Sequence, residues 1–180
     1  GNAYYSLGQF QRAIAFHEQS LEIKREIGDR QGEANSLGNL GNAYDSLGQY
    51  QRAIAFHEQY LEIEREIGDR VGESIALNNL GNALLKTNKL AEAESQLRAS
   101  IEIYETLLSE LVNNEHKASF FETQITSYRN LQKVLVAQTQ FDEALKISEM
   151  GRTRAFVELL QQTLLTTPPS VPPLSRGGSR

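Results

Sequence analysis

Histidine is the residue type in this chain that is best suited to acid–base or metal chemistry, and the chain has three. His17 and His57 follow Ala13 and Ala53 by four positions in nearly identical segments, whereas His116 lies in a polar stretch. A catalytic or metal-binding histidine needs carboxylates or other ligands that converge on it, and the repeated positions do not supply them. We therefore interpret His17 and His57 as partly buried packing residues and His116 as a solvated loop residue.

The other common catalytic signals are missing from the sequence. With no cysteine, the chain has no thiolate nucleophile, no disulfide and no cysteine-ligated zinc. It also contains no Gly-x4-Gly-Lys-Ser/Thr phosphate loop, no Gly-x-Gly-x-x-Gly after a strand and no Gly-x-Ser-x-Gly. We predict a protein that is not an enzyme, with no catalytic residues, no metal and no cofactor.

Charge and hydropathy narrow the choice of partners. The net charge is −5, although residues 129–180 carry seven Lys and Arg against four Asp and Glu. Net acidity argues against general nucleic-acid binding, which needs clustered basic residues. No apolar run approaches the roughly 18 residues of a membrane helix, and the first residues lack the features of a signal peptide. We expect a soluble, cytoplasmic protein that binds no membrane.

A repeat governs the organisation of the chain. Residues 1–40 and 41–80 are identical at 31 of 40 aligned positions. Within residues 34–73, apolar residues recur at helical spacing in two stripes that a break at residues 47–50 separates. All four prolines fall within the last 13 residues, so the preceding 167 residues contain none of the residues that are barred from helix interiors. Each unit is thus predicted to be two helices joined by a tight turn, and the fold class is all-α.

The sequence resembles the tetratricopeptide repeat, and the resemblance rests on a spaced set of residues. In the second unit these are Leu37, Leu40, Gly41, Tyr44, Gly48, Tyr50, Ala53 and His57. The crossing alanines Ala13, Ala53, Ala93 and Ala144 show that the last spacing holds 11 extra residues, which fall around residues 110–119. Forty-residue units without a closing proline are similar to the kinesin-light-chain-like subclass. The resemblance implies a right-handed superhelical solenoid of antiparallel helix pairs.

The predicted domain organisation follows the repeat. Residues 1–163 form the array: a partial unit (1–33), two full units (34–73 and 74–112), and an insert with a divergent unit (113–163). Residues 164–180 form a Pro/Ser/Gly-rich disordered tail. Because Gly1 aligns with Gly41, inside a motif, we expect that the array is part of a longer one and that residues 1–28 are its least protected helical part.

The resemblance also implies a binding surface. Residues two positions from the apolar stripe of each first helix point to the opposite helix face, which lines the concave groove of such arrays. The predicted groove residues are Asn35, Asn42, Asp45, Asn78, Asn82, Lys86, Arg129 and Lys133. The set Asn42, Asn82, Arg129 and Lys133 is similar to the carboxylate clamp with which some tetratricopeptide domains hold a partner's C-terminus. The alternative is that the asparagines are only duplicated template positions and that the two cations are solvated.

The segment near the C-terminus carries a second resemblance. Residues 144–155, followed by Leu159 and Leu160, are similar to the segment that ends the repeat array in CHAT-type proteins, ahead of a caspase-like protease domain. Within this segment Arg152 and Arg154 are expected to pair with Glu149 and Glu158 along their own helix, with docking onto a further domain as the alternative.

These features predict a protein–protein interaction scaffold that binds extended peptides, acidic or C-terminal, in its concave groove. It would be the regulatory repeat region of a CHAT-like protein that lacks the protease domain. Two alternatives stay open: a non-catalytic recognition subunit of an enzyme complex, and a structural protein that self-associates through exposed repeat ends.

Overall fold

The computed structural model describes the backbone of residues 1–110 and 117–166 and the side chains of residues 1–107 and 125–156. Within these ranges the chain forms eight α-helices and no strand, so the all-α prediction is confirmed. The helices are α1 (Asn2–Ser6), α2 (Phe10–Glu26), α3 (Arg30–Ser46), α4 (Tyr50–Ile67), α5 (Arg70–Lys86), α6 (Leu90–Glu110), α7 (Lys117–Ala137) and α8 (Phe141–Thr166).

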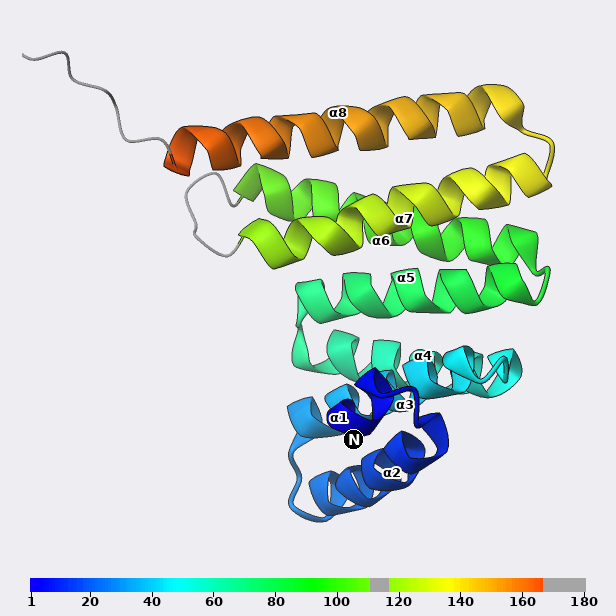
Figure 1. Cartoon of the computed structure of the whole chain (residues 1–180), viewed down its shortest axis with the longest axis vertical. Helices are drawn as coiled ribbons and strands as arrows, with labels where there is room; N and C mark the ends of the chain where they lie inside the picture. The colour runs from blue at the N-terminus through cyan, green and yellow to red at the C-terminus, as the bar shows by residue number, and fades with distance from the viewer. Residues whose placement is uncertain (111–116, 167–180) are drawn as a thin grey trace, which may run out of the picture.

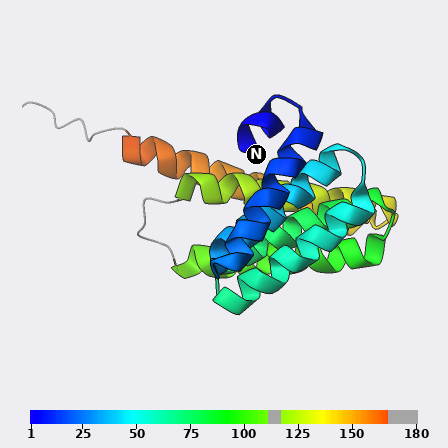
Figure 2. The same ribbon diagram turned by 90° about the horizontal axis from the view of Figure 1, so that it is seen from below.

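The helices stack in chain order along the long axis of the molecule (Figure 1). Each helix from α2 onward packs against the next one in the chain. The odd-numbered helices also touch one another, α3 with α5 and α5 with α7, whereas α2, α4 and α6 do not pack extensively together. A row whose first helices are closer together than its second helices must curve around the first helices. This places α3, α5 and α7 on the inner side of a solenoid, and the view from below shows the same array from one end (Figure 2).

Local capping explains where the helices begin and end. Asp29 and Asp69 each accept a hydrogen bond from the backbone N–H three residues ahead, at 2.8 Å from Gly32 N and 2.9 Å from Gly72 N. Such contacts satisfy donors that the first helical turn leaves free. Gly68 ends α4 in the left-handed conformation at a φ of 75°, which glycine adopts without steric cost. These caps fix where α3 and α5 begin and where α4 ends.

Close packing of each helix pair depends on small residues at the crossing. Ala13, Ala53, Ala93 and Ala144 are all buried, with at most 3% of their surface exposed. Next to this crossing, Gly41 leaves room for the ring of His57, since a Cβ at Gly41 would lie 2.4 Å from His57 Cε1. Large apolar residues fill the remaining space, including Leu37, Leu40, Leu77 and Leu80.

Some of the residues that lengthen the last repeat spacing are helical. Both α6 and α7 have 21 residues, against 18 in α4 and 17 in α5. The 11 extra residues predicted around 110–119 therefore include added helical turns, while residues 111–116 lie outside the described part. The predicted tail begins at residue 164, within the last turn of α8, and residues 167–180 also lie outside the described residues. Among the described helices, none combines the length and the apolar composition needed to cross a membrane.

Candidate peptide-binding face

The candidate site is the surface of α3, α5 and α7, which we call the first-helix face. These three helices come from successive repeat units and lie side by side. Residues at equivalent positions therefore form rows across the face: Asn42, Asn82 and Lys133 form one row, and Gly38, Asn78 and Arg129 form another. Repetition of the sequence thus places these polar side chains at regular intervals along the solenoid.

Two asparagines connect the second and third units on this face. Asn79 Nδ2 donates to Asn42 Oδ1 at 3.4 Å, and both side chains are half-buried. Asn82, one turn beyond Asn78, is half-buried and makes no hydrogen bond with another described residue. An asparagine amide both donates and accepts hydrogen bonds, so Asn82 can pair with the backbone of an extended peptide. Asn79 was not among the predicted residues, although Asn39 in the same repeat position could have drawn attention to it.

The acidic and basic residues at the end of this row pair with each other. Lys86 Nζ lies 2.5 Å from Asp45 Oδ2 and 5.3 Å from the centroid of the Tyr50 ring. Both contacts bridge neighbouring units, and they neutralise the charges that the sequence had offered to a ligand. Lys86 and Asp45 therefore serve to join two units in the free protein.

Asn78 lies differently from its predicted place in the groove. Its side chain is buried, with 5% of the residue exposed, and its Oδ1 accepts hydrogen bonds from Ser127 Oγ at 3.1 Å and Asn130 Nδ2 at 3.3 Å. The network continues to Ser100 and Ser74, which pair through their hydroxyls at 3.1 Å. Because α7 packs closely over this row, Asn78 is a structural residue between α5 and α7. The sequence pattern did not predict this buried network.

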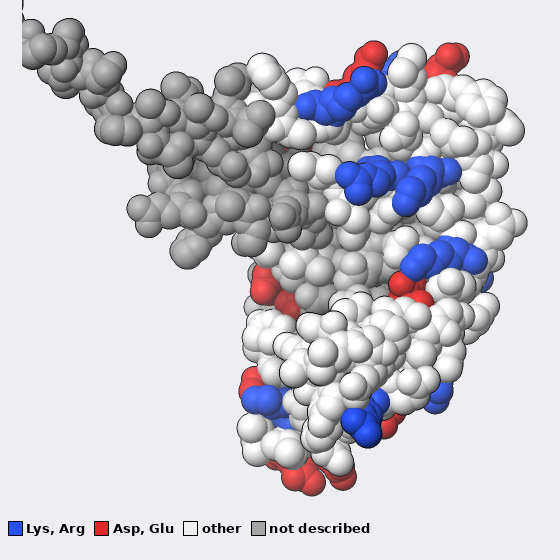
Figure 3. Space-filling view, viewed as in Figure 1, with Lys and Arg blue, Asp and Glu red and all other residues white. Residues whose placement is uncertain are grey.

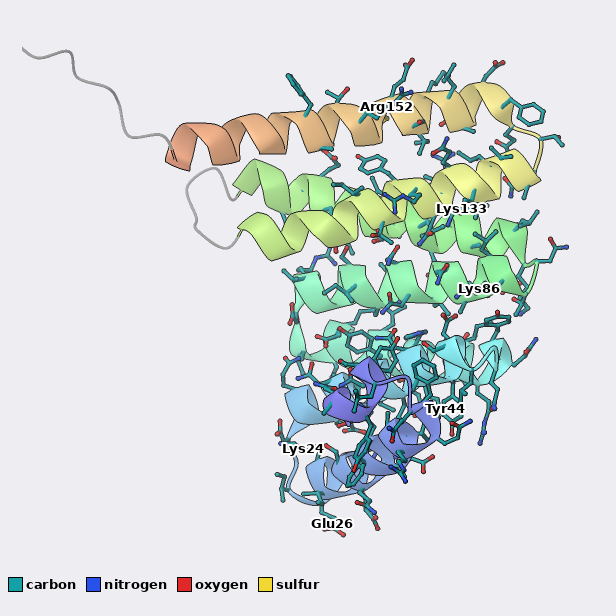
Figure 4. The ribbon with its side chains drawn as sticks, in the orientation of Figure 1. Lys24, Glu26, Tyr44, Lys86, Lys133 and Arg152 are labelled. Atoms are coloured by element: carbon teal, nitrogen blue, oxygen red, sulfur yellow. The ribbon has the colours of Figure 1, made fainter. Side chains whose placement is uncertain are left out.

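Basic residues without a partner gather at the C-terminal end of the face. Arg129 and Lys133 lie one turn apart on α7, are exposed, and form no ion pair with any described residue. Figure 3 shows blue surface over α7 on this side of the molecule. Lys86, Lys133 and Arg152 follow one another on α5, α7 and α8 (Figure 4). The free positive charge of this region can bind carboxylates.

The N-terminal end of the face is hollowed. A pocket of about 650 Å³ is lined by residues of α1, α2 and α3, among them Asn2, Lys24, Asn35 and Asn39. Lys24 Nζ lies 2.6 Å from Asp29 Oδ2, so its charge is already paired. Asn35 is exposed in this pocket, far along the array from Arg129. The structure thus separates the predicted residues into an N-terminal polar group and a C-terminal basic group.

Among the residues whose side chains the structure describes, neither arginine of α8 pairs with Glu149, and the side chain of Glu158 lies outside them. Arg154 donates from Nε to Glu105 Oε1 of α6 at 3.0 Å, and its other guanidinium nitrogen also contacts this carboxylate. Arg152 Nε instead donates to the backbone oxygen of Ser148 at 3.4 Å. Arg154 thus pairs with Glu105 of α6, a contact that spacing along α8 cannot reveal.

The histidines play the packing role predicted for them. His57 is 1% exposed, and burial lowers its pKa to about 4, so the ring is neutral at physiological pH. His17 is 6% exposed and has a pKa below its usual value for the same reason. Across the residues whose side chains are described, no cluster of three histidine or acidic side chains could hold a metal ion. His116 lies outside those residues.

Known proteins share both the repeat and the fold. Residues 1–66 and 75–116 match models of the tetratricopeptide repeat, together more than half of the chain. The chain belongs to the tetratricopeptide repeat proteins. Residues of this chain are 42% identical over 78 positions to tetratricopeptide repeat protein 28 of Mus musculus, a match that covers 43% of this chain and 3% of that relative.

Solved structures of other proteins share this fold. The apo form of RapI superposes with a TM-score of 0.75 at 20% identity, over 86% of this chain and 53% of RapI. A putative kinesin light chain of Podosopora anserina with nearly identical repeats superposes with a TM-score of 0.50 at 18% identity, over 86% of this chain and 90% of that one. These likenesses support the solenoid fold. Tetratricopeptide repeat proteins generally mediate protein–protein interactions, and their fold is typically a non-catalytic scaffold.

Proposed function

We propose that this tetratricopeptide repeat protein binds extended peptide segments of a partner protein along its first-helix face. The observation that carries the proposal is the contrast between paired and unpaired polar residues on this face. Asp45 and Lys86 neutralise each other, whereas Asn82, Arg129 and Lys133 have no partner among the described residues. Amides that can pair with a peptide backbone, next to cations that can pair with carboxylates, suit a segment that is acidic or ends in a free carboxylate.

The support differs along the face. Asn42 contributes one half-buried amide, which Asn79 already contacts weakly at 3.4 Å. Asn35 lies at the opposite end of the array from Arg129 and Lys133, so a peptide that touched both would have to run the length of the face. Asn78 is buried and takes no part in the proposal. We place the centre of binding at Asn82 and Lys133, which occupy the same position in successive units.

A peptide array on the purified chain tests this proposal. The array contains peptides of varied charge, each with a free or an amidated C-terminus. Binding should fall at least tenfold for Asn82→Ala and for Lys133→Glu, because each change removes a group that faces the peptide. Gln51→Ala and Lys146→Glu, at exposed positions on α4 and α8, are the matched controls and should bind normally. If the wild type and all four variants bound the peptides equally well, recognition in the groove would be refuted.

We infer that the chain is the regulatory repeat region of a CHAT-like protein. The support is the sequence of residues 144–155, which resembles the end of such an array and forms part of α8. Sequencing the gene beyond the codon for Arg180 tests this role. A reading frame with a His and a Cys at caspase-like spacing supports it, and a frame without them favours a stand-alone adaptor or the recognition subunit of a separate enzyme.

A further inference from the structure

A pocket between α7 and α8 includes one of the predicted groove residues, Arg129, but the sequence did not predict a cavity there. It encloses about 170 Å³ and is lined by residues of both helices, among them Ile125, Tyr128, Arg129, Ile147 and Arg152. Its floor is apolar, and two arginines belong to its wall, one from each helix. Since a water molecule takes roughly 30 Å³, the space is that of about six waters, which suits one aliphatic side chain.

The pocket exists because the fourth unit differs from the second at the helix crossing. Aligned on Ala53 and Ala144, the large residues His57, Tyr60 and Glu64 of α4 correspond to Ser148, Gly151 and Ala155 of α8. The three large side chains are buried in the second unit: His57 and Tyr60 pack against glycines of α3, and Glu64 packs against Gly72 of α5. Ser148, Gly151 and Ala155 are smaller and fill less space in the fourth unit, although Tyr128 of α7 packs against Gly151, and all three line the pocket.

Three positive charges around the pocket form no ion pair within the described part of the chain. Arg129 and Arg152, with Lys133 one turn along α7, have no carboxylate partner among the described residues. Glu105 of α6 accepts a hydrogen bond from the hydroxyl of Tyr128, a lining residue, at 2.7 Å and also accepts one from Arg154. Glu105 is thus occupied, and three cations from two helices face outward.

We propose that this pocket binds an aliphatic side chain of an acidic segment in a partner protein, with carboxylates of that segment paired to Arg129, Arg152 and Lys133. This inference deepens the proposed peptide-binding function and rests on it. Three separate cations exceed what one carboxylate can neutralise, so the charge favours several acidic residues around the apolar one over a lone terminal carboxylate. The apolar floor supplies the contact that fixes the register of the segment.

Binding of synthetic peptides, followed by fluorescence anisotropy, tests the inference. The probe is a labelled nine-residue peptide with a central leucine, two aspartates on each side and an amidated C-terminus. Replacement of its leucine by glycine, or of its aspartates by asparagines, should weaken binding at least tenfold, whereas freeing its C-terminus should change the affinity less than about twofold. If the peptide binds only with a free C-terminus, recognition of a terminal carboxylate replaces this inference.

Variants of the protein localise the binding. Arg152→Gln removes one cation, and Ala155→Leu fills the pocket, so each should weaken binding of the leucine peptide at least fivefold. Ser148→Leu is a second filling variant, and the melting temperature of each variant verifies its fold. Arg12→Gln, an exposed position on α2, is the control and should bind as the wild type does.

The outcomes separate this inference from the proposed groove. Binding that is lost in Asn82→Ala but unchanged in Arg152→Gln, Ala155→Leu and Ser148→Leu would overturn the pocket and leave the groove. Binding that is lost only in the pocket variants would support the pocket and move recognition away from Asn82. If no acidic peptide of the panel bound, the inference about the pocket would be refuted. The peptide-array experiment would still test binding in the groove.

Discussion

Glycines on the same helix of this array differ in how closely they approach the side chains of the next helix. Gly41 faces the buried ring of His57 so closely that a Cβ would lie 2.4 Å from the ring. Gly38, one turn earlier on the same helix, faces the ring of Tyr60 at 3.3 Å, which is an easier contact to adjust. The two glycines thus offer a matched pair for testing how much the crossing geometry depends on a missing side chain.

Substitution of Gly41 by alanine should destabilise the protein by about 2–3 kcal/mol, because the His57 ring has no room to move. Gly38→Ala should stay within about 1 kcal/mol of the wild type, since the gain in helix propensity offsets the tighter contact. Urea unfolding followed by circular dichroism measures both changes. Equal effects of the two substitutions would show that the close approach to His57 is not what requires glycine.

Glu64 is a buried carboxyl group with little compensation. It is 1% exposed, and Gln31 Nε2 donates to its Oε1 at 3.3 Å, whereas Oε2 has no hydrogen-bond partner. Burial, with the nearby negative charge of Asp69, raises the pKa of Glu64 to about 7. The same repeat position holds Lys24 in the first unit and Tyr104 in the third, so the fold tolerates basic, acidic and aromatic side chains at this position.

The raised pKa of Glu64 predicts a pH-dependent stability. The folded state binds this proton more tightly than the unfolded chain does, so the stabilisation is complete below a pH of about 4.5 and is lost as the pH rises through about 7. Glu64→Gln should therefore raise the free energy of unfolding at about pH 8, by up to about 3 kcal/mol, and flatten its pH dependence. Glu62→Gln, an exposed neighbour on α4, is the control. An unchanged pH profile in Glu64→Gln would contradict the assignment.

At the scale of helices, the polar network of α5, α6 and α7 joins units where the repeat spacing changes. Ser74, Ser100 and Ser127 form a chain of hydroxyl contacts at 3.1 Å, and Asn78 accepts from Ser127 and Asn130. All of these side chains are buried. Because each buried donor needs an acceptor, the network favours one register of α7 against α5.

Removal of the Asn78 amide should show how much this network contributes to the free energy of unfolding. Asn78→Ala leaves Ser127 and Asn130 without their shared acceptor and should lower the free energy of unfolding by about 1–3 kcal/mol. Asn82→Ala, one turn along α5 and without a hydrogen bond to a described residue, should be nearly neutral. Denaturant unfolding compares the two, and an equal loss in both would argue that the network adds nothing.

The first two helices are the least covered pair in the described array. Ile23 of α2 is 55% exposed, whereas Ile63 at the same position of α4 is 5% exposed, and α1 has only five residues. Backbone amides of α1 and α2 should therefore exchange with solvent faster than those of α3 and α4. Hydrogen exchange with mass spectrometry measures the difference, and equal protection in the two pairs would refute it.

At the scale of the whole molecule, both ends of the solenoid present apolar side chains. Phe16, Ile23 and Ile27 are exposed at one end, and Phe141, Leu145 and Met150 are exposed on α8 at the other. In an array each unit contacts only its neighbours, so the same kind of surface can stack against another copy. The two ends also differ in charge, since residues 129–180 are net basic in a chain that is acidic overall.

These exposed ends predict weak self-association. The average mass from static light scattering should rise with protein concentration, and Ile23→Lys combined with Leu145→Lys should restore the monomer mass by placing charges at both ends. Gln51→Lys is an exposed control on α4 that should not. A monomer mass that stays constant over the whole range for the wild-type chain would exclude association through the ends.

The sequence alone determined the elements of this protein, because the information for them is local. Helical spacing of apolar residues, Asp29 and Asp69 at helix starts, Gly68 at a helix end and alanines at the crossings all act within a turn or a unit. Period and similarity therefore predicted the all-α solenoid, its helix pairs and the packing role of His57. The repeat also put Asn42, Asn82 and Lys133 in one row.

Only the tertiary structure decided which polar groups remain free. Asn78 is buried because α7 packs over α5, Lys86 meets Asp45 across two units, and Arg154 turns to Glu105 of another helix. The pocket beside Arg152 likewise lies between α7 and α8 and is lined by residues of both helices. Each of these outcomes is a contact between residues far apart in the chain, and the spacing of residues along one helix carries no information about it.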